Sequence, residues 1–76
     1  MKVVAITKNQ CPRCVQAKNL LKGDSRVTWI NNETPEAQKL IADLDLMART
    51  APVFIIDDTT VLESMLRVKM MLDNEE

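Results

Sequence analysis

The chain has 76 residues, which suffices for one domain only (1–76), because domains usually contain roughly 100–200 residues. Hydrophobic residues make up 46% of it, which predicts a folded core and excludes a disordered chain. Ten basic and eleven acidic residues are mixed along the sequence, and the resulting net charge of −1 excludes a basic surface for nucleic acid or for a membrane.

The sequence predicts a cytoplasmic protein without membrane contact. No apolar run approaches the roughly 20 residues of a membrane span, and the run after Lys2 is too short for a signal peptide. Because cytosolic thiols stay reduced, a cysteine pair there is more often catalytic or metal-binding than structural. No sequence feature specifies a subunit interface, so a monomer is expected.

The first predicted elements are a strand, a helix and a second strand. Lys2 to Thr7 is short, apolar and β-branched, which is typical of a buried strand. A helix should begin at Pro12, because the first helical position needs no N–H, and Gly23 should end it. The predicted buried face of this helix contains Cys14, Ala17 and Leu21. The β-branched and aromatic stretch 26–31 predicts the second strand.

The second half of the chain predicts two more helices and a hairpin. Thr34, followed by Pro35 and Glu36, is a helix start signal. The apolar positions that follow keep helical spacing: Ala37, Leu40, Ile41, Leu44 and Met47. The run 53–56 predicts a buried strand, Asp57-Asp58 a turn, and 59–62 an edge strand. A final helix is predicted over 63–72, with its Met and Leu side chains mainly filling the core.

The order β-α-β-α-β-β-α predicts an α/β fold. Strands that alternate with helices favour parallel pairing of the first two strands, and the terminal hairpin adds antiparallel partners. The expected architecture is a four-stranded mixed sheet flanked by helices on both faces.

The motif Cys11-Pro12-Arg13-Cys14 follows a predicted strand and begins a predicted helix. Free N–H groups and the helix dipole at such a start favour the thiolate, which is the attacking form of cysteine. Lys8 and Arg13 add positive charge near the sulfur. We therefore expect Cys11 to attack a disulfide and Cys14 to resolve the mixed disulfide.

Other roles for the two cysteines are less well supported. A zinc site needs about four ligands, and this chain has two Cys and no His, so only two chains together could form one. A structural disulfide across so short a loop would stabilise the fold little. Two unrelated core cysteines would not explain the position at a strand-to-helix junction. No metal site is predicted.

The chain resembles the glutaredoxin family, in its short dithiol form. The resemblance rests on Lys8-Asn9-Gln10-Cys11-Pro12-Arg13-Cys14 and on Thr50-Ala51-Pro52 followed by an apolar strand. It implies a minimal thioredoxin-like fold, thiol–disulfide oxidoreductase activity and no tightly bound cofactor, with glutathione or a flavoprotein reductase as the electron source. It also implies that Pro52 is cis and faces the cysteines. The substrate-binding or glutathione-binding residues would be Pro12, Thr50, Ala51, Pro52 and Ser64.

Two departures from the family pattern affect the expected partner. Arg13 replaces a tyrosine, which should favour anionic partners. The family's Gly-Gly pair, which approaches the charged end of glutathione, falls at Leu62-Glu63. Glu63 would repel a carboxylate there, although an acid in the first turn of a helix is also simply stabilising. We therefore expect a disulfide-containing protein as substrate and weakened binding of glutathione.

The resemblance suggests one specific role and two alternatives. Short chains of this kind in phages and bacteria act as hydrogen donors to ribonucleotide reductase. One alternative is a glutathione-dependent iron–sulfur cluster-binding module, although the Gly-Phe-Ser-like motif of such relatives is absent. The other is a regulatory thiol switch, in which oxidation alters binding by the Met-rich last helix.

Overall fold

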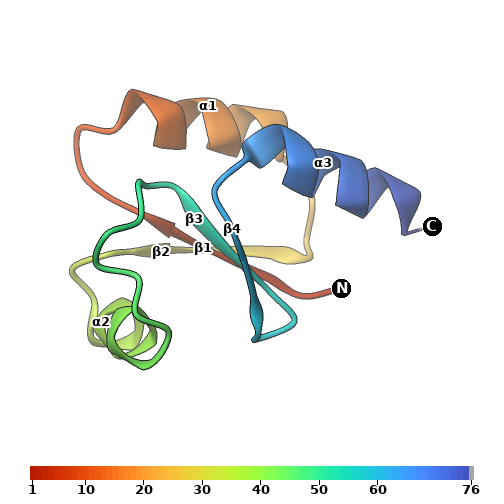
Figure 1. The fold of residues 1–76 in the computed structure, drawn as a ribbon. Coiled ribbons are helices and arrows are strands. Elements are labelled where there is room, and N and C mark those ends of the chain that lie inside the picture. Colours follow the sequence, from red (N-terminus) through yellow and green to blue (C-terminus); the bar gives the residue numbers. More distant parts are fainter. Residues whose placement is uncertain (76) are drawn as a thin grey trace.

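The computed structural model describes residues 1–75, with four strands and three helices in the predicted order (Figure 1). The elements are β1 (Val3–Thr7), α1 (Pro12–Leu20), β2 (Val27–Asn31), α2 (Pro35–Asp43), β3 (Val53–Ile56), β4 (Thr60–Leu62) and α3 (Met65–Asn74). The strand order in the sheet is β2-β1-β3-β4. β1 and β2 are parallel, whereas β3 is antiparallel to both β1 and β4. The predicted α/β architecture with a mixed sheet is confirmed.

The helices cover both faces of the sheet, with α1 and α3 on one face and α2 on the other (Figure 1). Because side chains alternate along a strand, each inner strand contributes to two cores. Ala5 and Phe54 belong to the core that includes residues of α1 and α3, and Ile6 and Ile55 to the core that includes Ala37 of α2. Within residues 1–75, no helix is long and apolar enough to cross a membrane.

α1 begins where the sequence predicts and ends earlier. Pro12 is the first helical residue and Cys11 is the N-cap. The last helical residue is Leu20, and the N–H of Leu21 still bonds to the carbonyl of Ala17. Gly23 lies beyond the helix with a φ of +83°, a backbone conformation that glycine adopts without steric cost. Gly23 therefore turns the chain toward β2 instead of capping α1.

α2 has the predicted start and a different end. The Oγ1 of Thr34 accepts a hydrogen bond from the N–H of Ala37 at 3.2 Å, which confirms the predicted cap. The helix ends at Asp43, and Asp45 then adopts a φ of +55°. This turn buries Leu46 and leaves Met47 80% exposed. The prediction that Met47 continues the apolar helical face is wrong, because the chain has left the helix before Met47.

The hairpin and α3 follow the prediction in outline. Asp57 and Asp58 both have positive φ, as a tight turn between antiparallel strands requires. Ser64 is the N-cap of α3, so Glu63 precedes the helix, and the alternative reading of Glu63 as a first-turn acid is wrong. The core-filling role predicted for the apolar side chains of this helix holds for Val68 and Leu72, which are buried. It does not hold for Leu66 and Met70, which are exposed.

Candidate functional site

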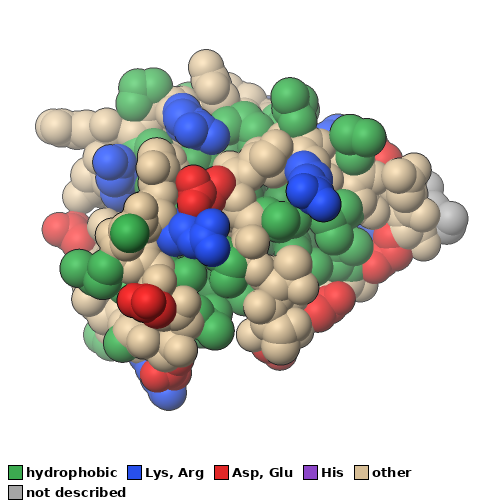
Figure 2. Space-filling model, viewed as in Figure 1, with side chains coloured by type: hydrophobic (Ala, Val, Ile, Leu, Met, Phe, Trp, Pro, Cys, Tyr) green, Lys and Arg blue, Asp and Glu red, His purple; other side chains and the backbone are tan. Residues whose placement is uncertain are grey.

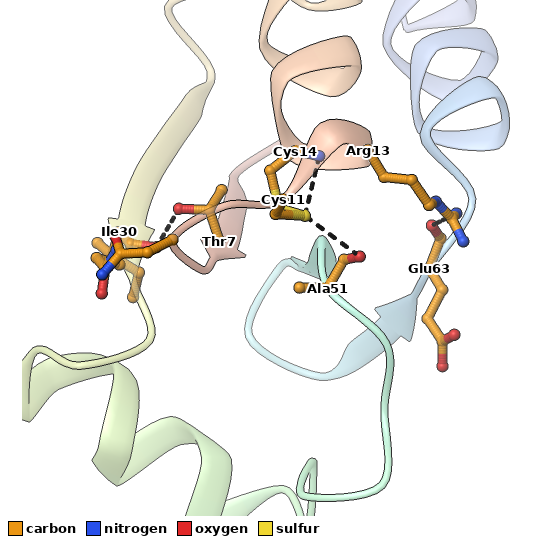
Figure 3. The surroundings of a disulfide bond; sticks show 9 residues. Thr7, Cys11, Arg13, Cys14, Ile30, Ala51 and Glu63 are labelled. Carbon is orange, nitrogen blue, oxygen red and sulfur yellow. Dashed lines mark hydrogen bonds between the residues drawn. A yellow bond between two sulfur atoms is a disulfide. The ribbon is translucent and has the colours of Figure 1, made fainter.

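The loop between β1 and α1 is fixed to the neighbouring strand on its way to the first cysteine. The buried hydroxyl of Thr7 donates to the carbonyl of Ile30 at 3.3 Å (Figure 3). Asn9 then accepts from the side-chain amide of Asn31 at 3.0 Å and donates to Glu33 at 3.1 Å. These bonds hold the loop against the C-terminal end of β2. The role of Asn9 is not apparent from the sequence, since its partners Asn31 and Glu33 lie more than twenty residues away.

Cys11 and Cys14 form a disulfide at the N-terminus of α1. The backbone N–H of Cys14 donates to Cys11 Sγ at 3.2 Å, so the sulfur is the capping group of the helix. Both residues are buried, and their Cα atoms are 5.2 Å apart, a separation usual for disulfides. The predicted placement of the first sulfur against free N–H groups is confirmed, and such a position favours a thiolate in the reduced protein.

The peptide bond between Ala51 and Pro52 is cis, as the resemblance implied. Pro52 is buried, Ala51 is half-buried and Thr50 is exposed. The carbonyl oxygen of Ala51 lies 3.9 Å from Cys11 Sγ (Figure 3). The structure thus brings the start of α1 and the segment before β3 together at one edge of the molecule. In the reduced protein, a Cys11 S–H could donate to this carbonyl.

The two cations predicted to stabilise the thiolate form no hydrogen bond to a sulfur among residues 1–75, in a structure that holds the cysteines oxidised. Arg13 donates to the carbonyl of Glu63 at 3.5 Å and extends away from the sulfurs (Figure 3). Lys8 is exposed and lines a cavity beside Ala51. The influence of Arg13 and Lys8 on Cys11 therefore acts through space, and it stays a prediction.

Glu63 forms an ion pair that is not apparent from the sequence. Its carboxylate pairs with the guanidinium of Arg49 at 3.1 Å, with the two side chains 34% and 47% exposed. Arg49 lies directly before Thr50-Ala51-Pro52, and this position in the sequence is the one indication that Arg49 belongs to the site. The neighbouring Ser64 accepts from the N–H of Arg67 at 3.2 Å as the cap of α3. Its hydroxyl hydrogen remains available for a ligand.

The cavity next to Ala51 has a volume of about 260 Å³. Its apolar part includes Ile6, Leu46 and Val53, and its polar part includes Lys8, Gln38 and Arg49. The cavity residues include two cations and no carboxylate. An apolar cavity with two cations fits a small ligand or side chain that carries a carboxylate.

Comparisons with known proteins found no match: no protein-family model, no curated protein and no solved structure matches the chain. Among residues 1–75, no three His, Cys, Asp or Glu side chains are grouped so that they could hold a metal ion. The features of the chain that bear on function are the two cysteines, the cis proline segment and the charges around them.

Proposed function

We propose that the protein is a dithiol–disulfide oxidoreductase of glutaredoxin type, with a minimal thioredoxin-like fold, and that it reduces disulfides of other proteins. The observation that carries the proposal is the Cys11–Cys14 bond at the start of α1, beside the carbonyl of Ala51. A disulfide at a helix N-terminus and next to a backbone edge can exchange with a disulfide of a peptide that lies along that edge.

The reaction transfers two electrons to the substrate. The Cys11 thiolate attacks one sulfur of the substrate disulfide, forming a Cys11–substrate bond and releasing one substrate thiolate, which takes up a proton. Cys14 then loses its proton and attacks Cys11 Sγ, which releases the second substrate thiol and forms the Cys11–Cys14 disulfide. The N–H of Cys14, bonded to Cys11 Sγ, stabilises negative charge on that sulfur in the reduced state.

Regeneration of the dithiol needs an external two-electron reductant, either two molecules of glutathione or a flavoprotein reductase. The cations Lys8 and Arg49 at the cavity beside Ala51 favour a carboxylate-bearing reductant such as glutathione. Glu63 opposes this preference, because it neutralises Arg49. Glutathione is therefore expected to reduce the Cys11–Cys14 disulfide, at a rate that depends on the strength of the Arg49–Glu63 ion pair.

Turnover measurements on cysteine variants test the proposal directly. The wild type should reduce a small disulfide and a protein disulfide such as that of insulin. The Cys11→Ser variant should lose both activities. The Cys14→Ser variant should accumulate a Cys11–substrate mixed disulfide, visible as a mass increase, and should lose reduction of protein disulfides. The double variant is the thiol-free control, because the chain has only two cysteines.

Two outcomes would contradict the mechanism. Full activity of Cys14→Ser on protein disulfides would show that one thiol suffices. Activity retained by Cys11→Ser would show that Cys14 is the nucleophile. A coupled assay with NADPH, using either glutathione with its reductase or thioredoxin reductase alone, then identifies the electron source.

A further inference from the structure

α3 exposes an apolar ridge that the fold does not use. Leu66 and Met70 are 65% and 63% exposed and stand one helical turn apart, so their side chains are neighbours. Large apolar side chains grouped on a surface are typical of contact sites. Figure 2 shows hydrophobic side chains exposed over α1 and α3, with Lys and Arg side chains between them.

A groove between α1 and α3 lies beside this ridge and shares Leu66 with it. It is lined by Arg13, Gln16 and Leu20 of α1 and by Ser64, Met65 and Leu66 at the start of α3. Arg13 belongs to the first turn of α1, the turn that Cys11 caps, so one end of the groove lies at the start of this helix. No carboxylate is among the lining residues.

The charges of the two helical layers are opposite. α1 and α3 carry Arg13, Lys18, Arg67 and Lys69 against a single acid, Asp73, which pairs with Lys69 at 2.8 Å. Within its bounds, α2 carries Glu36 and Asp43 against Lys39. Within residues 1–75, neither Arg13 nor Arg67 forms an ion pair with a carboxylate. An acidic partner is therefore attracted to the α1–α3 face.

We propose that the groove between α1 and α3, with the ridge of Leu66 and Met70, docks an acidic amphipathic segment of the protein substrate. This inference rests on the proposed function. Apolar side chains of the segment contact Leu66 and Met70, and its carboxylates meet Arg13 and Arg67. A second copy of this chain does not fit, because it would bring the same positive charges face to face. Docking there places a disulfide carried next to the segment near Cys11.

Binding of a labelled peptide tests the docking site without redox chemistry. The probe is a cysteine-free amphipathic peptide with Asp and Glu on its polar face, and its affinity is read by fluorescence anisotropy. The Leu66→Ser/Met70→Ser double variant should weaken binding about tenfold, because it removes two partly buried apolar contacts. Arg67→Glu should weaken it about fivefold and less at high salt, as expected for exposed charges.

Two matched controls separate the site from general effects. Lys39→Glu makes the same charge change on the exposed face of α2, where Lys39 is 77% exposed, and should leave the affinity nearly unchanged. A peptide with Asn and Gln in place of Asp and Glu should bind more weakly to the wild type and respond little to Arg67→Glu. If the double variant does not fold, Arg67→Glu and its control still decide the question.

The docking site would be excluded if the Leu66→Ser/Met70→Ser double variant and Arg67→Glu both bind the acidic peptide like the wild type, or if Arg67→Glu and Lys39→Glu weaken binding equally. A dimer in sedimentation that the double variant dissociates would show that a second copy occupies the groove. The redox step is checked separately with a small disulfide. If the wild type does not reduce the small disulfide, the proposed function is wrong. If the wild type and the variants all reduce it normally and the variants bind the peptide as the wild type does, only the docking site is wrong.

Discussion

Glu63 decides how much positive charge the cavity beside Ala51 presents to a ligand. Its carboxylate lies 3.1 Å from the guanidinium of Arg49, and Arg49 and Lys8 are the cations at that cavity. The pair is partly exposed, so its strength depends on salt and it can be broken by a competing anion. Arg13, which lies between the two cysteines in the sequence, donates a hydrogen bond to the backbone carbonyl of Glu63.

Removal of the Glu63 charge should make glutathione a better reductant. In Glu63→Gln, Arg49 is free to bind a carboxylate, and reduction of the Cys11–Cys14 disulfide by glutathione should become about two- to fivefold faster, the range expected for one exposed ion pair. The measurement is the rate of reduction by glutathione at low and high salt. The gain should shrink as salt increases.

The matched control is Asp58→Asn, which removes another ion-paired acid, bonded to Lys2 at the β3–β4 turn. It should leave the rate unchanged. An equal gain in both variants would mean that only net charge matters, and no gain in Glu63→Gln would show that the Arg49–Glu63 pair does not limit glutathione.

The sequence predicts the disulfide and the cis proline of this site better than it predicts their surroundings. Cys11, Cys14 and Pro52 each belong to a short motif that can be recognised from neighbouring residues alone, and the structure shows the Cys11–Cys14 bond and the cis bond before Pro52. The Arg49–Glu63 pair was missed because its partners come from different segments, and only the fold brings their side chains together. For the same reason, the hydrogen bonds of Asn9 to Asn31 and Glu33 could not be predicted from the sequence.

Helix starts were predicted well and helix ends poorly, for a physical reason. A cap such as Thr34 acts on an N–H three residues away, so the signal and the structure are local. The end of α2 depends on which side chain reaches the core, and the positive φ of Asp45 gives that place to Leu46 instead of Met47. Apolar spacing alone does not reveal where the chain turns.

The cap of α2 should contribute measurably to stability. Thr34 Oγ1 accepts from the N–H of Ala37 and donates to the carbonyl of Asn31 at 2.8 Å, so it links the end of β2 to the start of α2. Thr34→Ala should lower the free energy of unfolding by about 1 kcal/mol. Urea unfolding of the oxidised protein measures the change.

Thr34→Ser is the control, because it keeps the hydroxyl and should restore most of the lost stability. Equal destabilisation by serine and alanine would indicate that the methyl group of Thr34, and not its hydroxyl, stabilises this region.

An ion-pair cluster joins distant parts of the chain at the C-terminal end of α3. The guanidinium of Arg26 bonds to Asp24 at 2.7 Å, to the carbonyl of Leu72 at 3.2 Å and to Glu75 at 3.0 Å. It thus connects the α1–β2 loop with the last turn of α3. The side-chain hydrogen bond from Arg26, with help from the Arg26 backbone N–H, lowers the pKa of Asp24 to about 2. Folding therefore favours the charged form of Asp24.

The lowered pKa of Asp24 predicts how stability depends on acid. A carboxyl whose pKa is lower in the folded state stabilises the fold at all pH values above its unfolded pKa of 3.8, and this contribution is lost as the pH falls from about 4 toward 2. Asp24→Asn should therefore be less stable than the wild type at pH 7, and the two proteins should converge near pH 2. Urea midpoints at both pH values, on the oxidised proteins, measure the difference.

Asp43→Asn provides the comparison, because Asp43 forms an exposed ion pair with Lys39 one helical turn away. Pairs of that kind contribute little, so this variant should follow the wild type at both pH values. A deficit of Asp24→Asn that is the same at pH 7 and pH 2 would show that the asparagine disturbs the loop by its shape. A loss of stability that is present at pH 7 and absent at pH 2 would show that the charge of Asp24, held by Arg26, is what stabilises the fold. It would also show that this charge supports the connection that Arg26 makes between the α1–β2 loop and α3.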